Sequence, residues 1–205
     1  MPIKILILTN LMLFCWTGCA AEQQLDPSAA QAAIAAAWRS PQHTVWQIDW
    51  PAAPTGGRLT VETWRANGRY RFEILESTAP ALVGQTLIFD GQNAWRGNRF
   101  EADALQIVSA PLLAPVSETF EVIDRLLACP ATAATEQAGS TLNHGLAQIM
   151  GLSCANGDSL VMWLDQATGL PVRVKFSLKG NQADLQARYL EPMLQPPAGL
   201  FAPIP

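Results

Sequence analysis

The stretch RLTVETWRANGRYRFEILE, residues 58–76, contains two segments of alternating apolar and polar side chains joined by Asn67-Gly68. Alternation with a period of two is typical of a β-strand with one buried face, and Asn-Gly is a strong signal for a tight hairpin turn. Residues 58–65 and 69–76 are therefore predicted to form paired antiparallel strands. The side chains that share a face are Leu59, Val61 and Thr63 in the first strand, and Tyr70, Phe72 and Ile74 in the second.

Strand-like patterns continue on both sides of this hairpin. The strand-like segments are separated by turn signals such as Asp90-Gly91 and Asn156-Gly157. These residues readily adopt the backbone angles that tight turns require. The further predicted strands cover residues 43–50, 84–89, a short segment around Trp95, and residues 105–108, 132–138, 145–154, 160–164, 171–178 and 182–190.

Two segments have helical patterns instead. Residues 27–39 are rich in alanine, the best helix former, and Asp26-Pro27 supplies an N-cap followed by a proline at the first helical position. The second segment, about residues 117–127, has apolar side chains at helical spacing and Ser117 as its predicted N-cap.

About ten antiparallel strands and two helices, without strand–helix alternation, indicate an α+β fold. We expect a large curved antiparallel sheet, or unclosed β-barrel, covered by the N-terminal helix and the mid-chain helix. The sequence predicts one domain over residues 27–205. Its proline-rich tail from Pro192, which contains Leu200 and Phe201, is expected to pack on the domain in extended form.

The composition excludes two classes of protein. Seven tryptophans and 49% apolar residues among 205 argue against an intrinsically disordered chain. Only 13 Lys and Arg oppose 17 Asp and Glu, and no basic run is present, so nucleic acid is not an expected partner. The charged fraction of 15% is low, since soluble domains average about 25%.

The N-terminus is typical of a secretory signal peptide over residues 1–18. Lys4 is the one charge before Glu22, and residues 5–16 are nearly continuously apolar, which is too short a run to span a bilayer. Trp16-Thr17-Gly18-Cys19 resembles a bacterial lipobox, in which the cysteine sulfur receives diacylglycerol. We favour this interpretation, with Cys19 as lipid anchor and residues 19–26 as a tether, over ordinary cleavage after Ala21. Lys4 is the one charged side chain in residues 1–18, so removal of the signal peptide leaves the fraction of charged residues low.

Cys129 and Cys154 are the two cysteines of the predicted domain. In an oxidising compartment a structural disulfide between them is the expected state, and it would stabilise the fold by roughly 3–4 kcal/mol. A metal or catalytic role would need neighbouring histidines or further cysteines. The two histidines, His43 and His144, have no such neighbours.

Three pieces of sequence are similar to the bacterial outer-membrane lipoprotein-sorting (LolA/LolB-like) superfamily of lipid- and lipoprotein-binding proteins. They are residues 67–73 (NGRYRFE), 88–95 (IFDGQNAW) and 164–174 (LDQATGLPVRV). The resemblance implies an unclosed barrel whose helices form a lid over a hydrophobic cavity. It also implies binding of acyl chains or lipoproteins, without catalysis and without a cofactor. Because that superfamily also contains sensory domains, the alternative is a module that binds an exported or membrane protein partner.

The apolar strand faces supply the candidate ligand-binding side chains. For any one of them a role in the core is the simpler interpretation, but a sheet too large for two helices to fill can leave a cavity. The candidates are Trp46, Ile48, Trp50, Val61, Tyr70, Phe72, Ile74, Phe89, Trp95, Met162 and Leu164.

Five arginines lie near the predicted hairpin turns. They are Arg65, Arg69, Arg71, Arg96 and Arg99. A solvated rim is the simpler interpretation of this group, and contact with lipid headgroups is the alternative. No residue pattern indicates a catalytic site. The sequence therefore predicts a non-enzymatic protein on the extracytoplasmic side of a bacterial membrane, attached through its N-terminal lipid.

Overall fold

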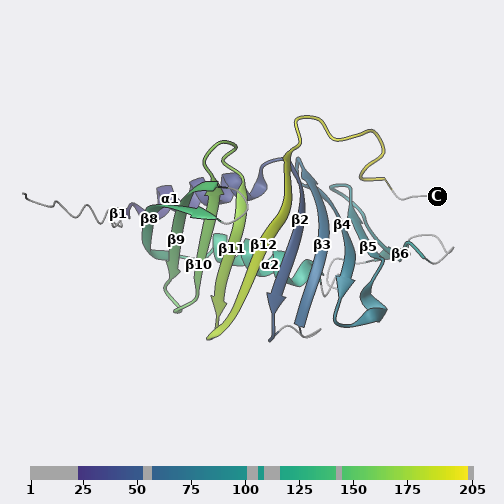
Figure 1. Ribbon diagram of the computed structural model, residues 1–205, viewed down its shortest axis with the longest axis horizontal. Helices are drawn as coiled ribbons and strands as arrows, with labels where there is room; N and C mark the ends of the chain where they lie inside the picture. Colours follow the sequence, from purple (N-terminus) through teal and green to yellow (C-terminus); the bar gives the residue numbers. More distant parts are fainter. Residues whose placement is uncertain (1–22, 53–56, 101–105, 109–115, 142–144, 203–205) are drawn as a thin grey trace, which may run out of the picture.

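A computed structural model describes residues 23–52, 57–100, 106–108, 116–141 and 145–202 (Figure 1). These residues form one twelve-stranded sheet with the order β1-β8-β9-β10-β11-β12-β2-β3-β4-β5-β6-β7. All its strand pairs are antiparallel, and β1 and β7 lie at its two edges, so the sheet is not closed. Two α-helices accompany it. The predicted α+β architecture is confirmed, with twelve described strands in place of about ten.

The strands agree closely with the predicted segments. Their bounds are β1 (Gln23–Leu25), β2 (Gln42–Trp50), β3 (Gly57–Ala66), β4 (Arg69–Ser77), β5 (Gln85–Phe89), β6 (Ala94–Asn98), β7 (Gln106–Val108), β8 (Ala131–Thr141), β9 (Gly145–Cys154), β10 (Ser159–Asp165), β11 (Pro171–Leu178) and β12 (Asn181–Pro192). The Asn67-Gly68 turn joins β3 to β4, and both turn residues have positive φ angles, 52° and 73°.

Part of the segment predicted as a tether, residues 23–25, forms strand β1. Residues 23–25 pair with β8, Gln23 opposite Glu136 and Leu25 opposite Ala134, and Leu25 packs against the core. The pairing partner lies more than a hundred residues further along the chain. A segment of three residues is too short to carry an alternation pattern that could indicate this pairing.

Helix α1 (Pro27–Arg39) begins and ends as predicted. A side-chain oxygen of Asp26 accepts a hydrogen bond from the Ala29 N–H at 2.8 Å, and the helix ends at Ser40, before Pro41. Helix α2 (Val116–Leu127) begins one residue before Ser117, so Ser117 is inside its first turn and not at the N-cap. The cause is the ordinary uncertainty of a helix boundary by one or two residues.

Both helices lie on the same side of the sheet (Figure 1), which we call its inner face. Alternate residues of β2, from Gln42 to Trp50, are buried there, while His43, Gln47 and Asp49 point to the opposite, outer face. Strand β12 pairs with β2, so the last strand of the chain lies beside the second one in the middle of the sheet. The predicted alternation of β2 is confirmed.

The tail beyond β12 packs on the outer face of the sheet. Met193 and Phe201 are buried there with Ala66 and Ile88, and Leu200 packs against them. A turn includes Gly199 and Leu200, so this part of the tail is not extended throughout. Leu194 is 96% exposed.

Candidate functional site

Ten of the eleven predicted cavity side chains belong to the core on the inner face. Eight of them are buried: Trp46, Ile48, Trp50, Val61, Phe72, Ile74, Met162 and Leu164. Tyr70 and Phe89 are partly buried and pack against that core.

A continuous run of aromatic rings lies between the helices and the sheet. Trp38 of α1 lies 6.2 Å from Trp46 and stacks on Phe120 of α2 at 5.6 Å between ring centroids. Phe120 stacks on Phe72 at 4.7 Å, and Phe72 on Tyr70 at 4.9 Å. Aromatic side chains from both helices therefore pack against the inner face of these strands, among the side chains that the sequence proposes as a cavity lining.

Trp95 lies apart from the other ten candidates. It packs with Ile88 and the tail residues Met193 and Phe201 in a second cluster. In the β5–β6 pair Trp95 lies opposite Ile88, while its neighbour Ala94 lies opposite Phe89 and belongs to the inner core. The small Ala94 faces inward and the large Trp95 outward, so side-chain size alone misassigns the face of this strand.

The predicted disulfide between Cys129 and Cys154 is present. It joins the segment after α2 to the end of β9. The Gln31 side chain of α1 donates hydrogen bonds to the carbonyl oxygens of Leu127 and Cys129, at 2.8 and 2.7 Å. Both helices and the sheet are thus connected at one corner. Cys19, the predicted lipid anchor, lies outside the described residues.

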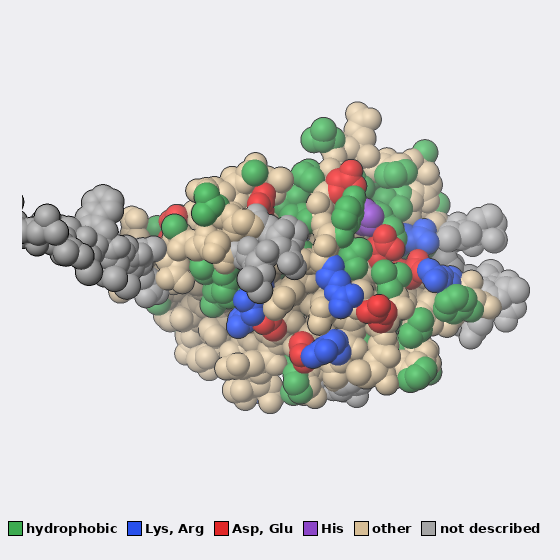
Figure 2. All heavy atoms as spheres, viewed as in Figure 1, with side chains coloured by type: hydrophobic (Ala, Val, Ile, Leu, Met, Phe, Trp, Pro, Cys, Tyr) green, Lys and Arg blue, Asp and Glu red, His purple; other side chains and the backbone are tan. Residues whose placement is uncertain are grey.

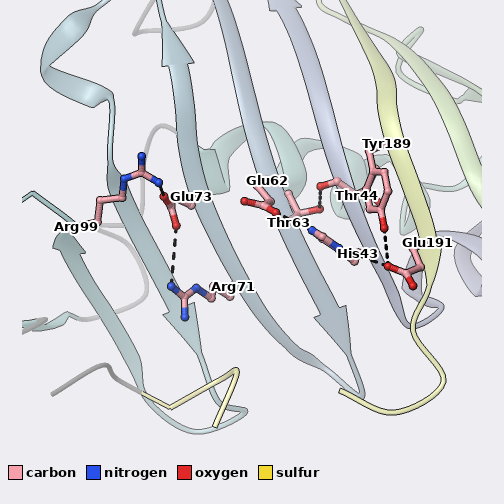
Figure 3. A network of polar contacts seen from close by, with 9 residues as sticks. All are labelled: His43, Thr44, Glu62, Thr63, Arg71, Glu73, Arg99, Tyr189 and Glu191. Carbon is pink, nitrogen blue, oxygen red and sulfur yellow. Dashed lines mark hydrogen bonds and ion pairs between the residues drawn. The ribbon is translucent and has the colours of Figure 1, made fainter. Parts of the chain in front are cut away.

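An aromatic cluster that the sequence did not indicate lies on the outer face. It consists of His43, Trp64 and Tyr189, which we call the outer aromatic cluster. The His43 ring stacks on Trp64 and meets Tyr189 edge-on, with 5.1 Å between centroids. His43 Nε2 lies 2.8 Å from a carboxylate oxygen of Glu62, and the Tyr189 hydroxyl donates to Glu191 at 2.6 Å (Figure 3).

The five arginines predicted to form a rim do not share one surface. Arg71 and Arg99 flank the carboxylate of Glu73 on the outer face (Figure 3), with nitrogen–oxygen distances of 4.0 and 2.5 Å. Glu73 is only 6% exposed, so these ion pairs compensate the burial of its charge. Arg65 instead follows the inward-facing positions of β3, opposite the buried Gln42.

A hollow of about 630 Å³ lies on the outer face, and we call it the outer hollow. Its polar lining side chains come from β2, β3, β10, β11 and β12. They are Gln47, Asp49, Arg58, Ser159, Lys175, Ser177, Gln182, Asp184 and Gln186. Figure 2 views this face and shows charged groups of both signs on it, with hydrophobic side chains around the one histidine in view.

Asp184 is a carboxylate of the outer hollow that contacts two basic side chains. Arg173 donates to both of its oxygens, at 3.0 and 2.5 Å, and Lys175 Nζ lies 3.6 Å away. Partial burial works to raise the pKa of Asp184, but the hydrogen bond from Arg173 and the two positive charges outweigh it and lower that pKa. The same hydrogen bond raises the pKa of Arg173. This pair is therefore ionised at neutral pH, and Arg173 holds the side chain of Asp184, a lining residue of the hollow.

In the part of the chain that the structure describes, no three His, Cys, Asp or Glu side chains are placed to hold a metal ion. His144 lies outside that part. Neither of the two described α-helices is long and apolar enough to cross a membrane.

No protein-family model matches the sequence, and no curated protein matches it. Solved structures do match. An uncharacterized conserved protein from Thermus thermophilus aligns with a TM-score of 0.56 and 14% identity, over 86% of this chain and 94% of that chain. A chain of the Pseudomonas aeruginosa MucA/MucB complex aligns with a TM-score of 0.51 and 16% identity, over 85% of this chain and 59% of that one. The present chain thus spans about three fifths of the matched MucA/MucB chain.

A LolA superfamily protein is also among the matches, with a lower TM-score. This is NE2245 from Nitrosomonas europaea, with a TM-score of 0.41 and 10% identity, over 86% of this chain and 97% of that chain. Identities this low carry information about the fold and not about the ligand. The two higher-scoring matches show that this chain shares its fold with the Thermus thermophilus protein and with a chain of the MucA/MucB complex.

Proposed function

We propose that this chain is an exported, non-catalytic binding module that holds a segment of another exported or membrane protein on the outer face of its sheet. One observation carries the proposal: the outer hollow and the outer aromatic cluster are neighbours on the outer face and share strands β2, β3 and β12. On the inner face, Trp38 of α1 packs on Trp46 of β2, and Phe120 of α2 packs on Phe72 of β4.

The geometry of β2 sets the size of this surface. His43 lies at one end and Asp49 at the other, with Gln47 between them on the same face. At about 3.3 Å per residue, six residues span about 20 Å, which matches a short extended peptide. Tyrosine and tryptophan at one end supply the kind of side chain that dominates binding energy at protein interfaces. Glutamine amides at the other end can pair with peptide groups.

The proposed location rests on two features. The N-terminal segment has the pattern of a signal peptide, and we propose Cys19 as its lipid anchor. The disulfide between Cys129 and Cys154 is of the kind that persists in an oxidising compartment. The Pseudomonas aeruginosa structure with this fold is a complex of MucA with MucB, which supports a protein as the class of ligand.

The second candidate is the binding of acyl chains or lipoproteins on the inner face. It is favoured by the ten predicted side chains that share that face and by the resemblance to lipoprotein-sorting proteins. Trp38 and Phe120 lie directly on Trp46 and Phe72, so a chain entering there has to move a helix. For that reason we place this function second.

Site-specific photo-crosslinking in intact cells distinguishes the two candidates. A photo-reactive phenylalanine analogue at Gln47 samples the outer hollow, and one at Tyr189 samples the outer aromatic cluster. The analogue at Arg125, an exposed residue of α2, is the matched control. We expect both outer-face positions, and not Arg125, to give one adduct with the same exported or membrane protein, reduced by Trp64→Ala.

Equal adduct yields at all three positions, or none at the outer face, would refute the outer-face proposal. Lipid extraction of the purified protein, followed by mass spectrometry, tests the second candidate in parallel. Stoichiometric acyl lipid without a protein adduct would assign the inner face as the binding site.

A further inference from the structure

A positively charged side chain occupies a core-lining position of β3. Val61 and Thr63 face inward and are fully buried, and Arg65 continues the same row at the end of the strand. Its guanidinium lies over the Trp38 ring, 4.4 Å from the centroid. Trp38 is itself fixed between Phe120 and Trp46, so the guanidinium rests on a rigid aromatic floor.

One nitrogen of this guanidinium is left without a partner. Arg65 Nη1 is inaccessible to solvent and makes no hydrogen bond with any described residue. Burial is the main cause that lowers the pKa of Arg65 to about 10, and the charge of Arg39 contributes in the same direction. At neutral pH the group is still protonated. A buried, charged N–H donor without an acceptor is unusual in folded proteins.

Arg65 lines a pocket of about 280 Å³ between α1, α2 and the β3–β4 hairpin. Its charged lining residues are Arg39, Arg65, Arg69 and Asp124. The Arg69 guanidinium lies over the Phe201 ring of the tail, 4.9 Å from its centroid, so Arg39, Arg65 and Asp124 leave one positive charge in excess, in a protein whose formal net charge is −4. None of the three arginines forms an ion pair with a carboxylate of the described residues.

The one carboxylate in the pocket is engaged elsewhere. Asp124 accepts a hydrogen bond from the Trp38 indole N–H at 3.1 Å, beneath the guanidinium. Tyr70 forms an apolar wall, stacked on Phe72 and on Phe89. The pocket thus has a cationic side and an aromatic side.

We propose that this pocket binds an oxyanion, a carboxylate or a phosphate group, between the guanidinium groups of Arg39 and Arg65, and that Arg65 Nη1 gains its missing acceptor when the side chain shifts toward the anion. Charge-assisted hydrogen bonds from a guanidinium suit such groups, and the Trp38 ring keeps the guanidinium beside the pocket. The volume lies just below the roughly 300–1,000 Å³ of pockets for drug-sized ligands. It fits a small anion or the charged end of an amphiphile. The inference does not depend on protein binding at the outer face.

Binding is tested by NMR titration of the purified protein with inorganic phosphate, acetate and octanoate. The Trp38 indole N–H is the reporter, because it donates to Asp124 below the guanidinium, and Trp38→Phe assigns its resonance. We expect a saturable shift of this resonance. Arg65→Gln should weaken binding by about tenfold or more. Arg125→Gln, which removes an exposed arginine from α2, should leave the affinity unchanged.

The three probes distinguish the source of the anion. Octanoate binding about tenfold tighter than acetate, equivalent to about 1.4 kcal/mol, assigns the site to the charged end of an amphiphile. Equal affinities assign it to a free anion. If Arg65→Gln does not fold, Arg65→Lys keeps the charge, loses the planar fork and should still weaken binding. No saturable shift of Trp38 with any probe, or unchanged affinity in the Arg65 variants, overturns the proposal.

Discussion

The imidazole ring of His43 lies flat against the indole ring of Trp64, with 4.9 Å between the ring centroids and 8° between their planes. The two residues are directly opposite each other on β2 and β3. Arg71 places its guanidinium 5.5 Å from the centroid of the same indole. The outer aromatic cluster is therefore a packed surface and not a set of separately mobile side chains.

This contact predicts a measurable coupling between the two residues. His43→Ala, Trp64→Ala and the double variant form a cycle, and urea unfolding of each gives the free energy of unfolding. Cross-strand pairs of this kind contribute roughly 0.2–1 kcal/mol, so the two single effects should fail to add by that amount. The control cycle of Trp64→Ala with Arg125→Ala on α2 should be additive. Additivity in both cycles would contradict the stacking.

Trp38 is the centre of the inner core and should be its most sensitive position. It is fully buried and contacts rings from β2 and α2. Trp38→Ala should lower the free energy of unfolding by about 3–5 kcal/mol, because truncation leaves a cavity that the neighbouring rings cannot fill. The exposed Leu194→Ala is the control, with a change within about 0.5 kcal/mol. A small effect of Trp38→Ala would mean that the core is loosely packed.

The local features of the fold could be predicted because their signals are short-range. The Asp26-Pro27 pair marks the start of α1, and Asn67-Gly68 marks a hairpin, since each depends on backbone angles within a few residues. The disulfide followed from counting, because Cys129 and Cys154 were the two cysteines left in the domain. The inward-facing side chains of β2 could be predicted from the alternation of apolar and polar residues along the strand.

The outer aromatic cluster could not be predicted, because its members meet through non-local pairing. Tyr189 reaches His43 because β12 pairs with β2, and no sequence signal specifies which strands become neighbours across such a distance. Trp95 lies apart from the other cavity candidates for a related reason: both it and the inward Ala94 are apolar, so hydrophobicity does not fix the face of β6. The inward position of Arg65 follows from the alternation of Val61 and Thr63, but no local pattern shows that its guanidinium packs on Trp38 of α1.

The N-cap of α1 should be worth a measurable part of the stability. Asp26 accepts a hydrogen bond from the Ala29 N–H, which otherwise has no partner in the first turn. Asp26→Ala should therefore cost about 0.5–2 kcal/mol in urea unfolding. Ser28→Ala, at an exposed position in the same turn, provides the comparison. Equal effects of the two changes would argue against the cap.

The disulfide should stabilise the protein against unfolding. Replacing both Cys129 and Cys154 by alanine should lower the free energy of unfolding by roughly 3–4 kcal/mol, since the bridge restricts the unfolded chain. Reductant should destabilise the wild-type protein to a similar extent and leave the double variant unchanged. If reductant also destabilised the double variant, the effect would have to arise elsewhere.

The Arg173–Asp184 pair predicts how stability depends on pH. The pKa of Asp184 is lower in the folded protein than its ordinary value of 3.8. A depressed carboxylate pKa stabilises the fold above the unfolded value, and this contribution is lost as the pH falls through the folded value. Between about pH 5 and pH 2 the wild-type protein should therefore lose stability more steeply than Asp184→Asn. Urea midpoints across this range measure both slopes, and Glu121→Gln, which removes an exposed carboxylate from α2, controls for the loss of one acidic group. Equal slopes for wild type and Asp184→Asn would show that the ion pair on the floor of the outer hollow does not stabilise the fold.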